Sequence, residues 1–154
     1  MYDEILVPTD GSDGVKQALD HAGAIAEKFD ARLHTIHVVQ TSGASETLDE
    51  EFADTLDRLE QAGEQAVETA REHARQAGHD IETTLEKGVP EAEIRGYIDE
   101  HDIDLVVMAT AGRTGSAREM LGSVTEDVVR STAVPVLTVN VGDSEQSNEP
   151  QRQE

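Results

Sequence analysis

The chain has 154 residues, of which 36% are hydrophobic, and this suits one globular domain with a core of ordinary size. Its 33 acidic and 12 basic residues give a formal net charge of −21, which disfavours binding to nucleic acids and to anionic membranes. The absence of cysteine excludes disulfides, thiolate metal sites and a cysteine nucleophile.

The first half of the chain predicts two strands and two helices. Residues 4–8 (EILVP) are a short apolar strand, and the polar turn at residues 9–12 can also cap the helix that follows. Apolar residues recur every three or four positions over residues 13–29, which predicts an amphipathic helix. Residues 31–39 form the second strand, and a long helical pattern runs from about residue 46 to Gly78.

The second half continues the alternation of strands and helices. Residues 80–86 alternate in polarity like a half-exposed edge strand, and Pro90 opens a helix that ends near residue 100. Residues 105–108 are continuously apolar, as in a parallel strand that is covered on both faces. A loop of small residues begins at residue 109, before a helix at residues 119–131 and a last strand at residues 134–139.

This order of elements predicts a single Rossmann-like α/β domain over residues 1–141. We expect a doubly wound, five-stranded parallel sheet with strand order 3-2-1-4-5 and right-handed crossovers. Residues 142–154 are polar, and we expect them to form a disordered acidic C-terminal tail. Neither a membrane-spanning apolar run nor a secretion signal is found, so we expect a cytoplasmic protein.

The distribution of charge indicates adaptation to high salt. Acidic residues are spread along the whole chain, and the lysines are confined to Lys16, Lys28 and Lys87. Such a surface suits molar salt, in which the Debye length falls to about 3 Å and self-repulsion is screened. We therefore interpret the composition as halophilic. The alternative is an acidic mesophilic protein with a charged tail.

Two loops are candidates for a ligand site, because doubly wound sheets bind ligands beyond the carboxyl ends of their strands. One loop follows the first strand at residues 8–12, and the other covers residues 109–123. If the first and fourth strands are neighbours, the loops share one crevice. Glycines in the second loop leave main-chain N–H groups accessible to an anion. Those glycines could also be simple turn residues, and Asp10 and Ser123 could be only helix caps.

Several segments together resemble the universal stress protein family. They are PTDGS at residues 8–12, His37-Val38-Val39, GVP at residues 88–90, GSVTE at residues 122–126 and the closing VPVLTV. The resemblance covers nearly all of the chain up to about residue 141. In the family's nucleotide-binding branch, the loop has the order Gly, two residues, Gly, nine residues, then Gly followed by Ser or Thr. Gly112 and Gly122-Ser123 match this spacing, and Ala109 replaces the first glycine.

The resemblance implies a bound adenine nucleotide, ATP or AMP, with Mg²⁺ or Mn²⁺ accompanying the phosphates. It places Asp10, Val38 and Met108 near the adenine and ribose, and it places the glycine loop around the phosphates, where Arg113 can add a charge-assisted contact. The candidate nucleotide-binding residues are Pro8, Thr9, Asp10, Val38, Met108, Ala109, Gly112, Arg113, Gly122, Ser123 and Val124.

The resemblance also implies a homodimer that acts as a stress-response or regulatory module. The last strand, between Val134 and Val139, would be an apolar sheet edge that pairs with its copy. We expect charged substitutions at Val136 and Val139 to give a monomer. No general base is evident beside the glycine loop, so we expect at most slow ATP hydrolysis.

Two alternatives remain open at this point. One is a stress-family dimer that binds no nucleotide and acts as a protein-interaction module, for which Ala109 is the clue. The other is a phosphoacceptor receiver domain. That domain needs an aspartate after the third strand and a lysine after the fifth, where this chain has Lys87 and Asn140. The sequence therefore favours the stress family over the receiver.

Overall fold

A five-stranded sheet forms the centre of the protein in a computed structural model that describes residues 1–41, 50–110 and 115–141, except for the side chains of residues 50–52 and 115–122. The sheet order is β3-β2-β1-β4-β5, and every neighbouring pair is parallel, which confirms the predicted topology. The strands are β1 (Glu4–Pro8), β2 (Arg32–Gln40), β3 (Ile81–Gly88), β4 (Leu105–Thr110) and β5 (Val136–Asn140).

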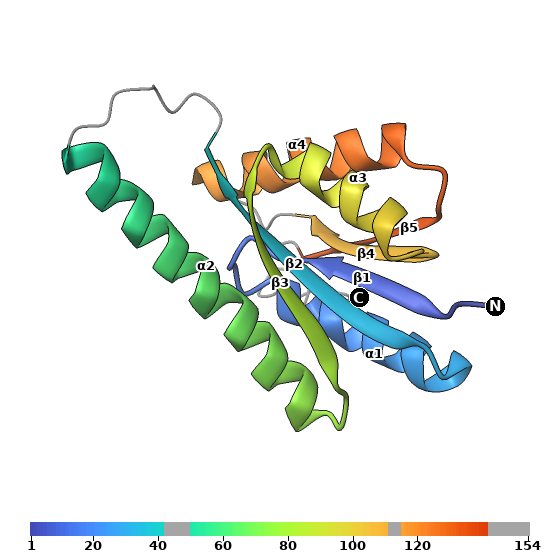
Figure 1. Ribbon diagram of the computed structural model, residues 1–154. Helices are drawn as coiled ribbons and strands as arrows, with labels where there is room; N and C mark the ends of the chain where they lie inside the picture. The colour runs from blue at the N-terminus through green and yellow to red at the C-terminus, as the bar shows by residue number, and fades with distance from the viewer. Residues whose placement is uncertain (42–49, 111–114, 142–154) are drawn as a thin grey trace, which may run out of the picture.

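The four helices of the described residues cover the two faces of this sheet (Figure 1). On one face, α1 and α2 pack against each other, and on the other face α3 and α4 do so. The doubly wound arrangement was expected from the alternation of strands and helices. The helices are α1 (Val15–Phe29), α2 (Glu50–Gln76), α3 (Pro90–Glu100) and α4 (Gly115–Ser131).

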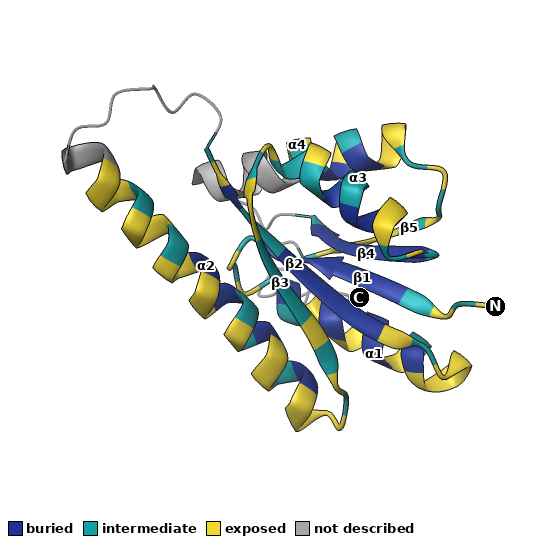
Figure 2. Cartoon of the chain, in the orientation of Figure 1, coloured by how far each residue is buried: buried dark blue, intermediate teal, exposed yellow. Residues whose placement is uncertain are grey.

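The central strand β1 and its neighbour β4 contribute much of the core. Ile5, Leu6 and Val7 of β1 are fully buried, as are Val106 and Val107 of β4 (Figure 2). These continuous apolar runs arise because helices cover both faces of a central parallel strand. The edge strand β3 is only partly buried, which agrees with its alternating sequence. Among the described residues, no helix has the length and apolar content needed to cross a bilayer.

Both proposed helix caps are wrong. Helix α1 begins at Val15, and its N-cap is Gly14 with no side-chain hydrogen bond. Asp10 does not reach this helix end, because its Oδ1 accepts a hydrogen bond of 2.9 Å from the N–H of Ser12. Helix α4 begins at Gly115 instead of residue 119, so Ser123 lies inside the helix.

Other element boundaries differ by a few residues. Strand β3 extends to Gly88, where it pairs with Gln40, so the edge strand is longer than its alternating pattern. Strand β5 begins at Val136, after Pro135, whose carbonyl accepts a hydrogen bond of 3.0 Å from the N–H of Val106. Proline has no N–H to donate, which suits a position just before the strand. The predicted tail at residues 142–154 and the predicted start of α2 near residue 46 lie outside the described residues.

Candidate functional site

A cavity of about 330 Å³ lies at the carboxyl ends of β1, β2 and β4, where the chain order of the sheet reverses. This is the position at which open α/β sheets bind ligands. The cavity brings together six residues that the sequence analysis proposed, which are Pro8, Thr9, Asp10, Val38, Met108 and Val124. The ends of β1 and β4, which carry the two candidate loops, therefore lie at one cavity, while residues 111–114 of the second loop lie outside the described residues.

Those of the remaining proposed residues that the structure describes do not line this cavity. Ala109 is 2% exposed and pairs with Val139 inside the sheet. Ser123 is exposed on α4. Gly112 and Arg113 lie outside the described residues, as do the surroundings of Gly122, which is part of α4.

The backbone at Ala109 is that of an ordinary strand. Positive φ angles at described residues other than glycine occur only at Asp30 and Asp102. An alanine in place of a glycine is strained only where φ is positive. Ala109 therefore imposes no strain of that kind on β4, and its methyl group belongs to the core.

The loop after β1 is held by a short series of hydrogen bonds. The N–H of Thr9 donates to the carbonyl of Ile36 at 2.9 Å, which attaches the loop to β2. The Thr9 side-chain oxygen accepts from the N–H of Gly11 at 3.0 Å, and Asp10 accepts from Ser12 as described above. Gly11 has a φ of +87°, a conformation that glycine adopts without strain. These bonds fix Asp10 at the rim of the cavity.

Val38 presents an open main-chain edge beside the cavity. Successive strand residues turn their N–H and C=O groups alternately toward the two neighbouring strands. The main-chain N–H and C=O of Ile36 point toward β1, as the bond from Thr9 to the Ile36 carbonyl shows. Those of Thr41 point toward β3, and the Thr41 N–H donates to the carbonyl of Gly88 at 3.3 Å. Val38 therefore faces the side on which β1 has already ended at Pro8. No main-chain partner for its N–H or C=O is found among the described residues.

The ring of His37, the residue before Val38 in β2, contacts the loop that follows β1. Its Nδ1 lies 2.9 Å from the carbonyl oxygen of Thr9. Because a carbonyl oxygen can only accept, Nδ1 carries the proton of this bond. The half-buried ring also packs against Gly63 of α2, where a methyl group would lie 2.8 Å from the ring Cδ2.

The sequence analysis missed eight residues that line the cavity. They come from β2, α2 and α3, and most of them are apolar: Ile36, His37, Val39, Gln40, Leu59, Ala62, Pro90 and Ile94. Leu59 belongs to the apolar seam of α2 that the sequence pattern indicates, and Ala62 lies three residues after it. His37 was visible as a polar residue at the end of an apolar strand. Neither signal says that a residue faces a ligand cavity.

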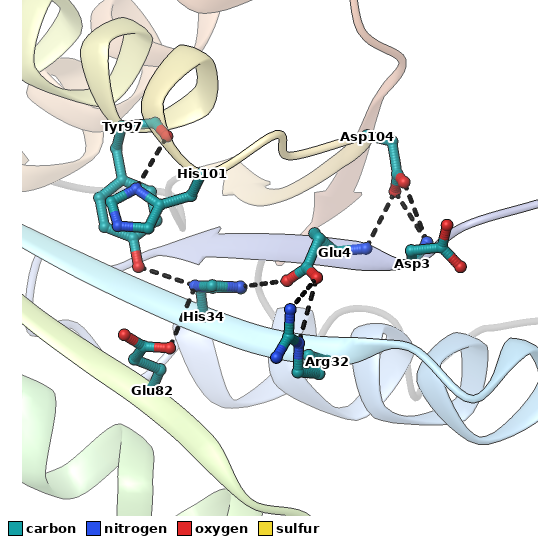
Figure 3. Close-up of polar contacts among 8 residues, drawn as sticks. All are labelled: Asp3, Glu4, Arg32, His34, Glu82, Tyr97, His101 and Asp104. Carbon is teal, nitrogen blue, oxygen red and sulfur yellow. Dashed lines mark hydrogen bonds and ion pairs between the residues drawn. The ribbon is translucent and has the colours of Figure 1, made fainter.

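A second polar cluster lies at the opposite, amino-terminal end of the sheet (Figure 3). His34 is buried, with Nδ1 lying 2.7 Å from the hydroxyl of Tyr97 and Nε2 lying 2.7 Å from a carboxylate oxygen of Glu4. Arg32 donates to the other carboxylate oxygen of Glu4, and the ring of His101 stacks on Tyr97 at 3.8 Å. These contacts tie β1, β2 and α3 together.

The pKa shifts of Glu4 and Tyr97 reflect both burial and hydrogen bonding. Burial alone would raise the pKa of Glu4, but hydrogen bonds from Arg32 and His34 and the charge interactions with these two residues together hold that pKa below 4.5. Burial raises the pKa of Tyr97 above 10.0, although a hydrogen bond with Thr84 opposes the shift. The cluster lies far along the strands from the cavity, and its contacts stabilise the packing of α3 on the sheet.

Comparison with known proteins agrees with this fold. A model of the "Universal stress protein family" matches residues 1–140. A universal stress protein of Methanocaldococcus jannaschii is 37% identical over 147 residues, which cover 90% of this chain and 82% of that protein. The structure of UspA from Lactobacillus plantarum is similar, with a TM-score of 0.76, 30% identity and coverage of 90% of this chain and 97% of that one.

A further similar structure contains a ligand. It is a universal stress protein in complex with cAMP, with a TM-score of 0.66 and 29% identity over 91% of this chain and 98% of that one. The family match spans every strand and helix described above, and the strand order and the motifs of the sequence agree with it. The chain belongs to the universal stress protein family.

Proposed function

We propose that the protein binds an adenine nucleotide, ATP or AMP, in the cavity and acts as a homodimeric stress-response or regulatory module. The observation that carries this proposal is the open N–H and C=O of Val38 beside a largely apolar cavity. Adenine presents an amino donor next to a ring-nitrogen acceptor, which complements this pair of groups. The cavity volume of about 330 Å³ falls within the range of small-molecule sites.

Asp10 is suited to bind the ribose. One of its carboxylate oxygens is held by the N–H of Ser12, and no bond to the other is found among the described residues. A carboxylate accepts hydrogen bonds from sugar hydroxyls, and a held carboxylate loses little freedom on binding. Asp10 would thus orient the nucleoside while Val38 binds its base.

The phosphates belong, in this proposal, at the loop that carries Gly112 and Arg113 and at the amino-terminal end of α4. The first N–H groups of a helix have no partner within the helix and favour anions. Ser123 lies farther along α4, so its exposed hydroxyl, and not its N–H, is the group that could reach a phosphate. Gly122 precedes it in the same helix.

An accompanying Mg²⁺ or Mn²⁺ would be held by phosphate oxygens and water. Magnesium in nucleotide sites commonly keeps several waters and uses substrate oxygens as ligands. Among the described residues, no group of three or more histidine, aspartate or glutamate side chains is placed to hold a metal. In this proposal the ion arrives with the nucleotide, bound to its phosphate oxygens.

The test is binding of ATP, AMP and GTP to nucleotide-stripped protein in molar KCl, measured by calorimetry and by thermal unfolding. ATP at about 100 times its dissociation constant should stabilise the fold by about 2.7 kcal/mol. Selective stabilisation by adenine nucleotides supports the proposal. No binding of any adenine ligand at millimolar concentration would contradict it and would favour a stress-family dimer that acts through protein contacts alone.

Dimerisation through β5 is part of the proposal. In the described part of the chain, β5 lies at the edge of the sheet beside β4 and exposes Leu137, which is 38% accessible. An exposed apolar edge strand favours pairing with a second copy about a two-fold axis. Val139 is 8% exposed and belongs to the core, so a charge there would unfold the protein. Leu137 is the better position for testing the interface.

A further inference from the structure

The ring of His37 bonds to the main-chain group through which the hydrogen-bonded pairing of β1 with β2 would otherwise continue. β1 ends at Pro8 opposite Ile36, and β2 runs on to Gln40. In a parallel ladder, the next bond after that from Thr9 to Ile36 runs from the N–H of Val38 to the carbonyl of Thr9. In the structure, that carbonyl instead accepts from the ring of His37 at 2.9 Å.

The His37 ring is confined in this orientation. It lies between the Thr9 carbonyl and α2, where a methyl group on Gly63 would come within 2.8 Å of its Cδ2. Because a carbonyl oxygen can only accept, Nδ1 is the donor of this bond, and the bond and the packing against Gly63 together hold the ring in place.

We propose that His37 is a positioning residue that replaces main-chain pairing at the end of β1 with a side-chain bond. By engaging the carbonyl of Thr9, it keeps the N–H of Val38 open toward the cavity and holds the loop in which Asp10 binds Ser12. The inference that this serves a ligand rests on the proposed function. The replacement of the Val38 bond by the His37 bond is a property of the protein without any ligand.

Three variants test this role. His37→Asn retains an N–H donor at about the place of Nδ1, whereas His37→Ala and His37→Leu remove the donor, and Leu keeps much of the ring's volume. His21→Ala is the matched control, because His21 is an exposed histidine on α1. Amide hydrogen exchange of the ligand-free full chain is followed by NMR at Val38, Gly11 and Ser12.

We expect the amide exchange rate to change in opposite directions at Val38 and in the loop that contains Gly11 and Ser12. In His37→Ala and His37→Leu, the N–H of Val38 can bond to the released Thr9 carbonyl, so its exchange slows, while exchange at Gly11 and Ser12 becomes faster. General destabilisation would speed up exchange at all of these amides. His37→Asn and His21→Ala should match the unmodified protein. Unchanged or faster exchange at Val38 in both donor-free variants would overturn the proposal.

Adenosine binding provides the functional readout, because it involves the cavity without any phosphate. We expect His37→Ala and His37→Leu to bind adenosine about 3- to 10-fold more weakly, the effect of one hydrogen bond, and His37→Asn to restore the affinity. Equal affinity of all the variants would overturn the proposed role in binding. If the unmodified protein does not bind adenosine, the proposed function fails, whereas the exchange at Val38 still decides the role of His37.

Discussion

Gly63 of α2 lies directly against the ring of His37, and this contact sets how closely the helix approaches the cavity. A methyl group on Gly63 would lie 2.8 Å from Cδ2 of His37 and 2.7 Å from Cδ1 of Leu85. Either separation is too short for carbon atoms in contact, whose best distance is about 3.5–4.0 Å. Glycine at this position therefore lets α2 reach the sheet beside the bond between His37 and Thr9.

Gly63→Ala should destabilise the protein and weaken adenosine binding. Leu85 can turn its methyl group away, but the His37 ring is held, so we expect a cost of about 1–3 kcal/mol in unfolding free energy. Denaturant unfolding and calorimetry measure the two effects. Gly96→Ala on α3 is the matched control, because nothing lies within 4 Å of its added methyl group. Equal stabilities of the two variants would contradict the close contact.

Leu59→Ala should weaken adenosine binding with little loss of stability. Leu59 lines the cavity and is 44% exposed, so its side chain contributes little to the core and can be covered by a bound base. We expect binding to be about 3- to 10-fold weaker and a stability change within about 0.5 kcal/mol. Titration calorimetry and thermal unfolding separate the two quantities. Unaltered affinity would show that the ligand does not contact Leu59.

Glu4→Gln should remove a pH-dependent part of the stability. The pKa of Glu4 is held below 4.5, so the carboxylate contributes its full stabilisation above that pH. The contribution is lost as the pH falls through the lowered pKa of the folded state. We expect Glu4→Gln to cost about 1–3 kcal/mol at neutral pH, because it weakens charge-assisted bonds to Arg32 and His34.

Comparison of the two proteins across pH isolates this effect from the titration of the other acids. The difference in unfolding free energy between the unmodified protein and Glu4→Gln should shrink below about pH 4.5. Urea denaturation at constant ionic strength measures it. A difference that stays constant down to acidic pH would mean that the hydrogen bonds of Glu4 do not depend on its charge.

Salt should stabilise the fold strongly. With a net charge of −21, the acidic side chains of the folded protein repel one another. Raising KCl from about 0.1 M to about 1 M shortens the Debye length from about 10 Å to about 3 Å and so screens this repulsion. We expect the midpoint of thermal unfolding to rise over this range and less so in an uncharged osmolyte of equal osmolality. A midpoint that does not change with KCl would contradict the interpretation of the composition as halophilic.

Leu137→Glu should convert the proposed dimer into a monomer that remains folded. Leu137 is exposed on the edge strand, so a carboxylate there leaves the core intact and places like charges opposite each other in the paired sheet. Light scattering in high salt gives the mass, and circular dichroism checks the fold. A dimer mass that survives the substitution would place the interface elsewhere. Val129→Glu on α4, also exposed, is the control that lies outside the edge strand.

Much of the fold could be predicted from local patterns. The bounds of β1 and the extent of α3 follow from a short apolar run and from Pro90 at the start of a helix. The start of α4 was predicted too late, because the small residues after β4 resemble a loop by composition. The cap assigned to Asp10 was wrong because an aspartate in a turn has several nearby N–H donors, and the folded loop selects that of Ser12.

The sequence by itself determined the class of the fold, the order of its elements and the family. These follow from apolar periodicity and from motifs that are local in the chain. Only the tertiary structure decided that Leu59, Pro90 and His37 join the cavity, and that Val38 is left with an open edge. The physical reason is that β1 ends before β2, so the direction of each main-chain group and its partner depend on pairing between segments distant in sequence.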